Sequence, residues 1–261
     1  MKILHFFDCA GIGALLSHEL DNFGVQSKVI QLSPFDPFGF GGYYHNTTYY
    51  NHSNELIYYA QKVMRDQDWI ILHDAPEYLD LFTDTQANCA VYYHGSRLRH
   101  SFSDFRKIDE TAEKIFLSTN DLLEYRPNGI VIPQPIDTQL FRDVTPQKNQ
   151  AMLMIQRRRD REEIEKYARS RFPNILYRER DNNIIYYGDM PKLLSQFGSY
   201  LDIKFTYDQP IRVIPNMSLT GLQALSCGLT VYDHKFDPHV GLPSENDSQT
   251  TALRFLSELE K

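Results

Sequence analysis

The sequence predicts an α/β protein built from two Rossmann-like domains that face each other across a cleft. Short, near-continuous apolar runs alternate with stretches of helical period along the whole chain, which is typical of parallel strands covered by helices on both faces. The chain opens with an apolar run, a glycine turn and a helical pattern, as a Rossmann-type unit does. A break containing two prolines at 133–137 then separates two series of this alternation.

In the first domain, predicted as residues 1–135, the run Lys2–Phe7 is β-prone and the pattern Ala14–Leu20 is helical. Gly11 and Gly13 lie in the turn between them and let main chain approach a phosphate or a sugar. The same rules predict the remaining elements of this domain, namely strands at 27–32, 68–73, 89–93, 115–118 and 129–132 and helices at 55–64, 77–82, 102–114 and 120–125.

Residues 34–53 differ from their surroundings because glycines and aromatic rings dominate them. This composition indicates a loop that closes over a ligand and stacks on it, with sugars and lipids as candidate guests. A loop packed by its own rings is an equally good interpretation.

The second domain, predicted as residues 136–261, repeats the β/α alternation. The expected elements are strands at 152–156, 175–177, 184–187, 201–205 and 229–232 and helices at 160–171, 191–197, 222–227 and 249–259. We expect the last helix to pack back at the domain junction.

The stretch 211–233 is the one to which the rest of the chain is expected to bring its functional groups. Ser218 and Thr220 are good N-cap residues for the helix that follows, and Gly221 lets a ligand come close to the backbone. A helix start with hydroxyls and free N–H groups binds phosphate well. The alternative is an ordinary capped core helix.

His94 follows the apolar strand 89–93 directly. Ligands of open α/β sheets bind beyond the carboxyl ends of the strands, so His94 is the catalytic candidate of the first domain. A purely structural histidine is the alternative. Arg97 and Arg99 come next and are either ion-pair partners or anion contacts.

The net charge of −7 arises within residues 1–133, which excludes an extended nucleic-acid surface. A basic cluster at 157–180 suffices to bind a compact anion such as a diphosphate, although neighbouring glutamates also explain it as a solvated helix face.

The three cysteines are widely spaced and predict reduced thiols rather than a metal or redox centre. No apolar run reaches membrane-spanning length and the start lacks a signal-peptide core, so we expect a cytoplasmic protein without a transmembrane segment.

The chain contains four segments in this order: MKILHFF…GIG, VYYHGSRLR, FLSTNDLLEY with VIPQPIDTQLF, and LTGLQALSCGLTVYD. Through these segments the chain resembles the GT-B glycosyltransferases, and among them the retaining enzymes of the family 4 type (group 1). The resemblance implies two Rossmann-like domains and transfer of a sugar from a nucleotide-diphosphate donor to an acceptor hydroxyl. The acceptor would be a glycan, a lipid or a protein, and contact with a membrane surface is compatible with this. It also implies retention, no metal ion and no cofactor beyond the donor.

The resemblance also implies residue roles. His94 would be catalytic beside the transferred sugar, and Gly11 and Arg99 would lie on the acceptor side. The groups implied to bind the donor and its phosphates are Gly13, Arg157, Arg161, Arg212, Ser218, Leu219, Thr220, Gly221 and Gln223.

The chain departs from the family pattern at two positions, because Pro215 and Gln223 stand where the family has glutamates eight residues apart. This departure favours a second hypothesis, a non-catalytic GT-B relative that binds a nucleotide or a glycan as a partner protein. A third hypothesis is another GT-B enzyme, such as an epimerase or a phosphorylase.

Overall fold

A computed structural model describes residues 1–8, 10–95, 97–99, 109–142, 150–155, 168, 172, 175–179, 184–204 and 213–261. The chain divides into two compact units. The first comprises Met1–Pro135 together with Ser248–Lys261, and the second comprises Ile136–Asp247. The C-terminal helix therefore belongs to the first unit.

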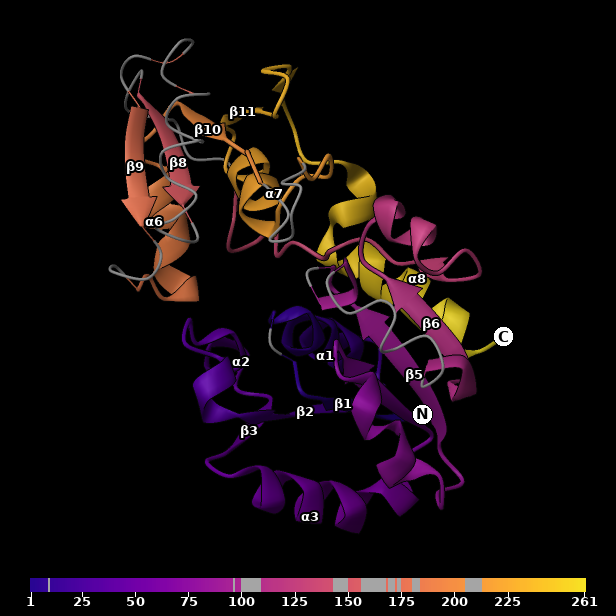
Figure 1. The fold of residues 1–261 in the computed structure, drawn as a ribbon. Coiled ribbons are helices and arrows are strands. Elements are labelled where there is room, and N and C mark those ends of the chain that lie inside the picture. The colour runs from indigo at the N-terminus through magenta and orange to yellow at the C-terminus, as the bar shows by residue number, and fades with distance from the viewer. Residues whose placement is uncertain are drawn as a thin grey trace. The chain divides into compact units, whose positions relative to one another are not determined.

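The first unit is a seven-stranded parallel sheet with the order β3-β2-β1-β4-β5-β6-β7 (Figure 1). Its strands are β1 Lys2–Phe6, β2 Gln26–Leu32, β3 Thr47–Tyr50, β4 Trp69–His73, β5 Asn88–Tyr93, β6 Lys114–Leu117 and β7 Ile130–Val131. The order reverses beside β1, since β2 and β3 extend the sheet on one side and β4 onward on the other. This is the doubly wound order of a Rossmann fold.

Helices cover both faces of this sheet (Figure 1). α3 Ser53–Val63 packs on one face with the 3-10 segment Pro76–Phe82, and α1 Ile12–Asn22 packs on the other with α8 Ser248–Leu259. Side chains alternate along each strand, so odd positions of β1 and β4 face α1 and α8. Both faces are apolar, which explains the near-continuous hydrophobic runs of the strands.

The C-terminal helix α8 is an integral part of the first core. Ala252, Phe255 and Leu259 recur at helical spacing and are buried against α1 and the sheet. At the start of α8, the Ser248 hydroxyl donates a hydrogen bond of 2.5 Å to the buried Glu19 carboxylate on α1. Helix 249–259 of the sequence prediction is thus confirmed in type and position.

The second unit contains a five-stranded sheet with the order β12-β11-β10-β8-β9. Its strands are β8 Ala151–Ile155, β9 Ile175–Glu179, β10 Ser199–Leu201, β11 Thr230–Tyr232 and β12 Pro238–His239, all parallel except β12. Its described helices are α6 Met190–Leu194 and α7 Leu219–Ser226. The order of the four parallel strands again reverses, between β8 and β10.

Some expected elements are wrong. Residues 34–53 are not one loop, because they contain α2 Phe40–Tyr44 and the edge strand β3, which pairs with β2. The expected strand 184–187 is absent; those residues lead into the 3-10 turn Tyr187–Asp189. Of the predicted helix 102–114, the structure describes only residues 109–114. These residues form a 3-10 turn at Asp109–Thr111 followed by the start of β6, so the helix prediction is wrong there. The predicted helix 160–171 falls outside the described residues except at Ala168.

No helix in the described part of the chain combines the length and the apolar character needed to cross a membrane.

We predict that Phe255→Ala destabilises the first unit by about 3–5 kcal/mol, because it removes a fully buried aromatic ring from the core. Trp69 is the single tryptophan of the chain and lies in the same core, so its fluorescence during chemical unfolding reports on this unit. Leu253→Ala, on the same helix but 51% exposed, is the matched control and should change stability by less than about 0.5 kcal/mol. Equal effects of the two changes would show that α8 does not pack here.

Candidate functional site

The candidate site lies at the carboxyl ends of β1, β4 and β5, next to the point where the strand order reverses. Asp8 follows β1, His73 is the last residue of β4 and His94 follows β5. Parallel strands end at one edge of the sheet, so the topology brings these three side chains together from distant parts of the sequence. Ligands of doubly wound folds bind at this position.

The Asp8 carboxylate lies at the N-terminus of α1. Its Oδ2 accepts a hydrogen bond of 2.8 Å from the Ala14 N–H, and the Gln31 side-chain amide donates to the Asp8 carbonyl. Asp8 is 4% exposed, and this burial raises the pKa of its carboxyl to about 6. The helix N–H groups oppose the shift, since they favour the charged form.

His73 joins Asp8 to two further histidines. Its Nδ1 lies 3.8 Å from Asp8 Oδ1 and 2.8 Å from His94 Nε2, while its Nε2 lies 2.8 Å from Nδ1 of His5 on β1. Gly13 makes this possible, because a Cβ there would lie 2.8 Å from His73 Nε2. Gly13 therefore packs against His73 and Asp8, and the nearby carboxylate disfavours a phosphate at this helix end because like charges repel.

Gly11 has a φ of 74°, a left-handed conformation that favours glycine. A Cβ at this position would lie 2.4 Å from the Phe40 ring, so the start of α2 covers the turn. The acceptor-side role implied for Gly11 stays a prediction.

Two strands that lead into the site end in strained backbone. Phe7 and Asp74 both have positive φ, 66° and 52°, which is uncommon for residues other than glycine. Asp74 is buried, and its Oδ1 accepts a hydrogen bond of 3.0 Å from the His94 N–H. Burial raises the pKa of Asp74 to about 7. Backbone strain and perturbed carboxyl pKa values are both enriched at functional sites.

The two arginines after β5 form ion pairs. Arg99 contacts the Asp121 carboxylate at 2.7 Å and packs on Gly95, and Arg97 contacts Glu77 at 2.6 Å. The ion-pair interpretation of the sequence holds for both. The acceptor-side role implied for Arg99 stays a prediction.

Asp8, His73 and His94 each offer an atom that can bind a metal ion, and these atoms lie within 4.8 Å of one another. The 2.8 Å between His73 Nδ1 and His94 Nε2 is, however, the length of a nitrogen–nitrogen hydrogen bond. A proton between the rings accounts for this separation, so we interpret the group as a hydrogen-bonded cluster.

In the second unit, Ser218 is the N-cap of α7, as the sequence predicted, and its hydroxyl oxygen accepts a hydrogen bond from the Gly221 N–H. The buried Asp202 carboxylate, just after β10, accepts a hydrogen bond from the Ser218 N–H at 2.5 Å. A Cβ at Gly221 would lie 2.7 Å from Asp202 Oδ2, so glycine is needed for this carboxylate to fit. Within the described residues, no hydrogen bond engages the N–H groups of Leu219 and Thr220, which are therefore the ones that could bind an anion.

Other predicted donor-side residues are placed as follows. Gln223 lies in α7 and is buried, whereas Pro215 is exposed just before that helix. Arg157, Arg161 and Arg212 lie outside the described residues.

Sequence reasoning missed His5, Asp8, His73 and Asp74. Asp8, His73 and Asp74 end or follow apolar strands, which is the signal that identified His94, so the same rule finds them when it is applied to every strand. His5 carries no such signal, because it lies within the apolar run of β1.

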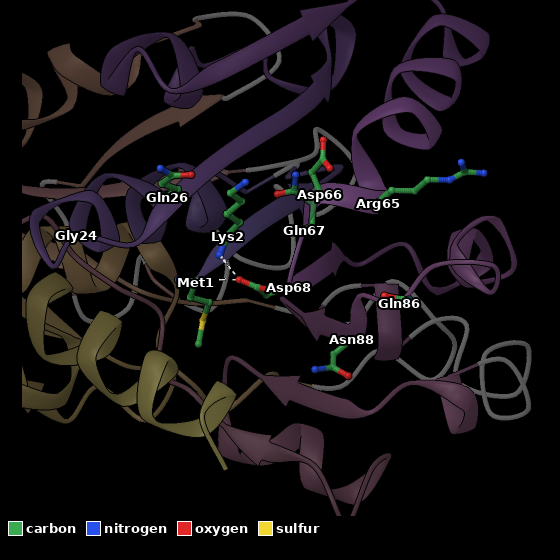
Figure 2. Close-up of a pocket in the computed structure, with 10 residues that line it drawn as sticks. All are labelled: Met1, Lys2, Gly24, Gln26, Arg65, Asp66, Gln67, Asp68, Gln86 and Asn88. Carbon is green, nitrogen blue, oxygen red and sulfur yellow. Dashed lines mark hydrogen bonds and ion pairs between the residues drawn. The ribbon is translucent and has the colours of Figure 1, made fainter.

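A polar hollow of about 590 Å³ lies at the opposite, amino-terminal edge of the first sheet (Figure 2). It is lined by Met1, Lys2, Gly24, Gln26, Arg65, Asp66, Gln67, Asp68, Gln86 and Asn88. Its mostly exposed side chains form no buried polar cluster like that at the carboxyl edge.

Two solved structures resemble the whole chain. The first, AviGT4, is a glycosyltransferase involved in avilamycin A biosynthesis, with a TM-score of 0.61, 10% identity and coverage of 100% of this chain and 97% of that one. The second is an alpha-glucosyltransferase in complex with UDP and a 13-mer DNA containing an A:G mismatch, with a TM-score of 0.59, 13% identity and coverage of 100% and 90%. The chain has a GT-B fold. At these identities the likeness shows the fold alone, and neither a family model nor a curated protein sequence matches the chain.

We predict a specific pH dependence for Asp8→Asn in this GT-B protein. The raised pKa of about 6 means that the folded chain holds the Asp8 proton between about pH 4 and pH 6, while the unfolded chain has lost it. This group therefore lowers stability as pH rises through that window, and asparagine abolishes the effect. The stability of Asp8→Asn relative to wild type should rise by about 2.4 kcal/mol from pH 4 to pH 7.

Chemical unfolding followed by Trp69 fluorescence measures this difference. Asp21→Asn, an exposed change on α1, is the control and should alter stability by less than about 0.5 kcal/mol at each pH. A difference for Asp8→Asn that stays constant across this range would contradict the assigned burial of the carboxylate.

Proposed function

We propose that the protein is a glycosyltransferase that moves a sugar from a nucleotide-diphosphate donor to an acceptor hydroxyl. The likeness in fold to two glycosyltransferases over the whole chain carries this proposal. The polar cluster of Asp8, His73 and His94 supports it, because it lies at the strand edge where this class of fold binds ligands.

His94 is the catalytic group of the proposal. Its Nδ1 has no hydrogen-bond partner among the described residues, whereas its Nε2 and its backbone N–H are both engaged. Nδ1 is buried and unpaired among the described residues, and it is the atom proposed to share a hydrogen bond with a sugar oxygen when the donor binds. Burial lowers the pKa of His94 to about 3, so the ring acts as a neutral hydrogen-bonding group and not as a cation.

The donor diphosphate is proposed to bind at the N-terminus of α7 through the N–H groups of Leu219 and Thr220. The Asp202 carboxylate beside them is negative, so positive charge is needed as well. Arg157, Arg161 and Arg212 are proposed to supply it, as the family resemblance implies, and would stabilise the leaving diphosphate without a metal ion.

Retention of anomeric configuration is part of the proposal and rests on the resemblance to family 4 enzymes. In that scheme the acceptor attacks on the face of the leaving group, and the leaving phosphate takes the acceptor proton. The Asp8 carboxylate agrees with this, since its hydrogen bond to α1 and its burial make it a poor nucleophile.

The acceptor is proposed to be a hydroxyl of a glycan, a lipid or a protein. A nucleic-acid acceptor is disfavoured, because the net charge of −7 would repel a polyanion.

A non-catalytic nucleotide- or glycan-binding partner protein is the second candidate. The replacement of the family's glutamates by Pro215 and Gln223 favours it. Release of nucleoside diphosphate from a nucleotide sugar separates the two, because a binding protein releases none.

The proposed function is tested by a thermal-shift screen against UDP, GDP, ADP, CMP and dTDP, each with and without its sugar. A ligand at 100 times its Kd should add about 2.7 kcal/mol of stability. A rise with one nucleotide identifies the donor class and is the expected result. No rise with any of them would overturn the proposal.

We predict that His94→Ala lowers turnover at least ~100-fold, the scale of a positioned catalytic group. The measurement is the rate of nucleoside diphosphate release at saturating donor, with the melting temperature as a check of folding. His52→Ala replaces an exposed histidine at the start of α3 and should leave turnover unchanged. Turnover of His94→Ala within twofold of wild type would remove His94 from the catalytic site.

A further inference from the structure

Three histidines of the first unit form one hydrogen-bonded chain. His5 Nδ1 lies 2.8 Å from His73 Nε2, and His73 Nδ1 lies 2.8 Å from His94 Nε2. They come from three adjacent strands, β1, β4 and β5, and the first two are fully buried. Both ends of the chain are buried and unpaired, since His5 Nε2 and His94 Nδ1 have no hydrogen-bond partner among the described residues.

All three rings are neutral at physiological pH. Burial lowers the pKa of His5 and of His94 to about 3 and that of His73 well below its usual value. A neutral imidazole has one N–H and one bare nitrogen, so each ring donates through one nitrogen and accepts through the other.

Two hydrogen bonds in series leave only two proton arrangements. In the first, every ring carries its proton on Nδ1, so His5 donates to His73 and His73 donates to His94. In the second, every ring carries it on Nε2 and both bonds are reversed. The tautomer of His94 is thus coupled to that of His5 through His73, which is hydrogen-bonded to both.

The Asp8 carboxylate selects between the two arrangements. Its Oδ1 lies 3.8 Å from His73 Nδ1 and has no hydrogen-bond partner of its own in the described part of the chain. A negative charge so close favours the proton on the Nδ1 that it faces. The Ala14 N–H fixes the position of the carboxylate, and Gly13 leaves room for His73 beside it.

We propose that His73 and His5 are positioning residues that hold His94 in its Nδ1–H form, so that His94 donates a hydrogen bond to an oxygen of the bound sugar. This inference rests on the proposed function for the identity of the ligand. The same ring with its proton on Nε2 would offer a bare Nδ1 and would suit a hydroxyl donor instead.

The chain orients His94 and does not conduct protons. Proton conduction requires that the far end be able to take up a proton, but His5 Nε2 is buried with no partner and the ring lies 6.1 Å from that of Phe255 on α8. Loss of the chain should therefore change how well His94 is aligned and should not abolish the reaction.

The direct test is the tautomer of each ring, read from nitrogen-15 and carbon-13 chemical shifts of histidine-labelled protein at pH 7.5. Resonances are assigned through His5→Asn, His73→Gln and His94→Gln. We expect His5, His73 and His94 all in the Nδ1–H form. His94 in the Nε2–H form, or bound to a metal ion carried through purification, would overturn the proposal.

A matched pair of variants tests the consequence for turnover. His5→Asn keeps an N–H donor close to the position of Nδ1, whereas His5→Leu removes it. We expect His5→Leu to lower kcat about tenfold with little change in KM, and His5→Asn to recover most of that loss. Equal losses in both variants would assign His5 a packing role only and overturn the proposal.

Phe255→Leu is the control for packing, since it alters the ring beside His5 and leaves the hydrogen bonds in place. It should keep His94 in the Nδ1–H form and kcat near wild type. If His5→Leu does not fold, Asp8→Asn serves instead and should give a mixture of His94 tautomers. An unchanged His94 spectrum in Asp8→Asn would contradict the selecting role of the carboxylate.

Failure of this inference and failure of the proposed function are distinguishable. The tautomers are measured without substrate, so they can be as expected in a protein that transfers no sugar. Transfer of sugar by a protein whose His94 carries its proton on Nε2 would refute the inference alone.

Discussion

The first unit depends on the Asp8 carboxylate at the N-terminus of α1. It accepts the Ala14 N–H, lies beside His73 and comes directly after the strand at which the sheet order reverses. A buried carboxylate without such donors would cost more stability still, so the helix N–H groups offset part of the cost of burying the charge. The negative charge of the same carboxylate also favours the proton on Nδ1 of His73 in the histidine chain. Strand β1, helix α1 and the catalytic candidate His94 are therefore linked through Asp8 and His73.

The second unit repeats this arrangement. Asp202 follows β10 as Asp8 follows β1, and its carboxylate accepts the N–H of Ser218 at the start of α7. In both units a glycine in the first turn of the helix leaves space beside the carboxylate. This glycine is Gly13 next to Asp8 in the first unit and Gly221 next to Asp202 in the second. Helix starts of this kind commonly bind a ligand anion. Here each already holds a carboxylate, so a diphosphate has to rely on the remaining N–H groups and on arginine side chains.

The sequence predicted six of the seven parallel strands of the first unit, because burial on both faces leaves continuous apolar runs. It failed at 34–53, where Thr47–Tyr50 pairs with β2 and Asp36 accepts the N–H groups of Phe40 and Gly41 to start α2. The amino-acid composition of 34–53 does not show which of its residues form these hydrogen bonds, so it could not predict the strand or the helix. His94 was predictable from its place after a strand. Its partner His5 was not, because a histidine within an apolar strand carries no signal until the fold brings His73 to it, 68 residues away.

In the proposed function, the sugar of the donor binds at the carboxyl edge of the first sheet, beside His94. Hydrogen–deuterium exchange with a bound nucleotide sugar locates it directly. We expect slower exchange at 10–14 and 93–99 and unchanged exchange around the polar hollow of Figure 2. Slower exchange confined to 24–26, 65–68 and 86–88, which border that hollow, would place the ligand at the opposite edge of the sheet and contradict the account.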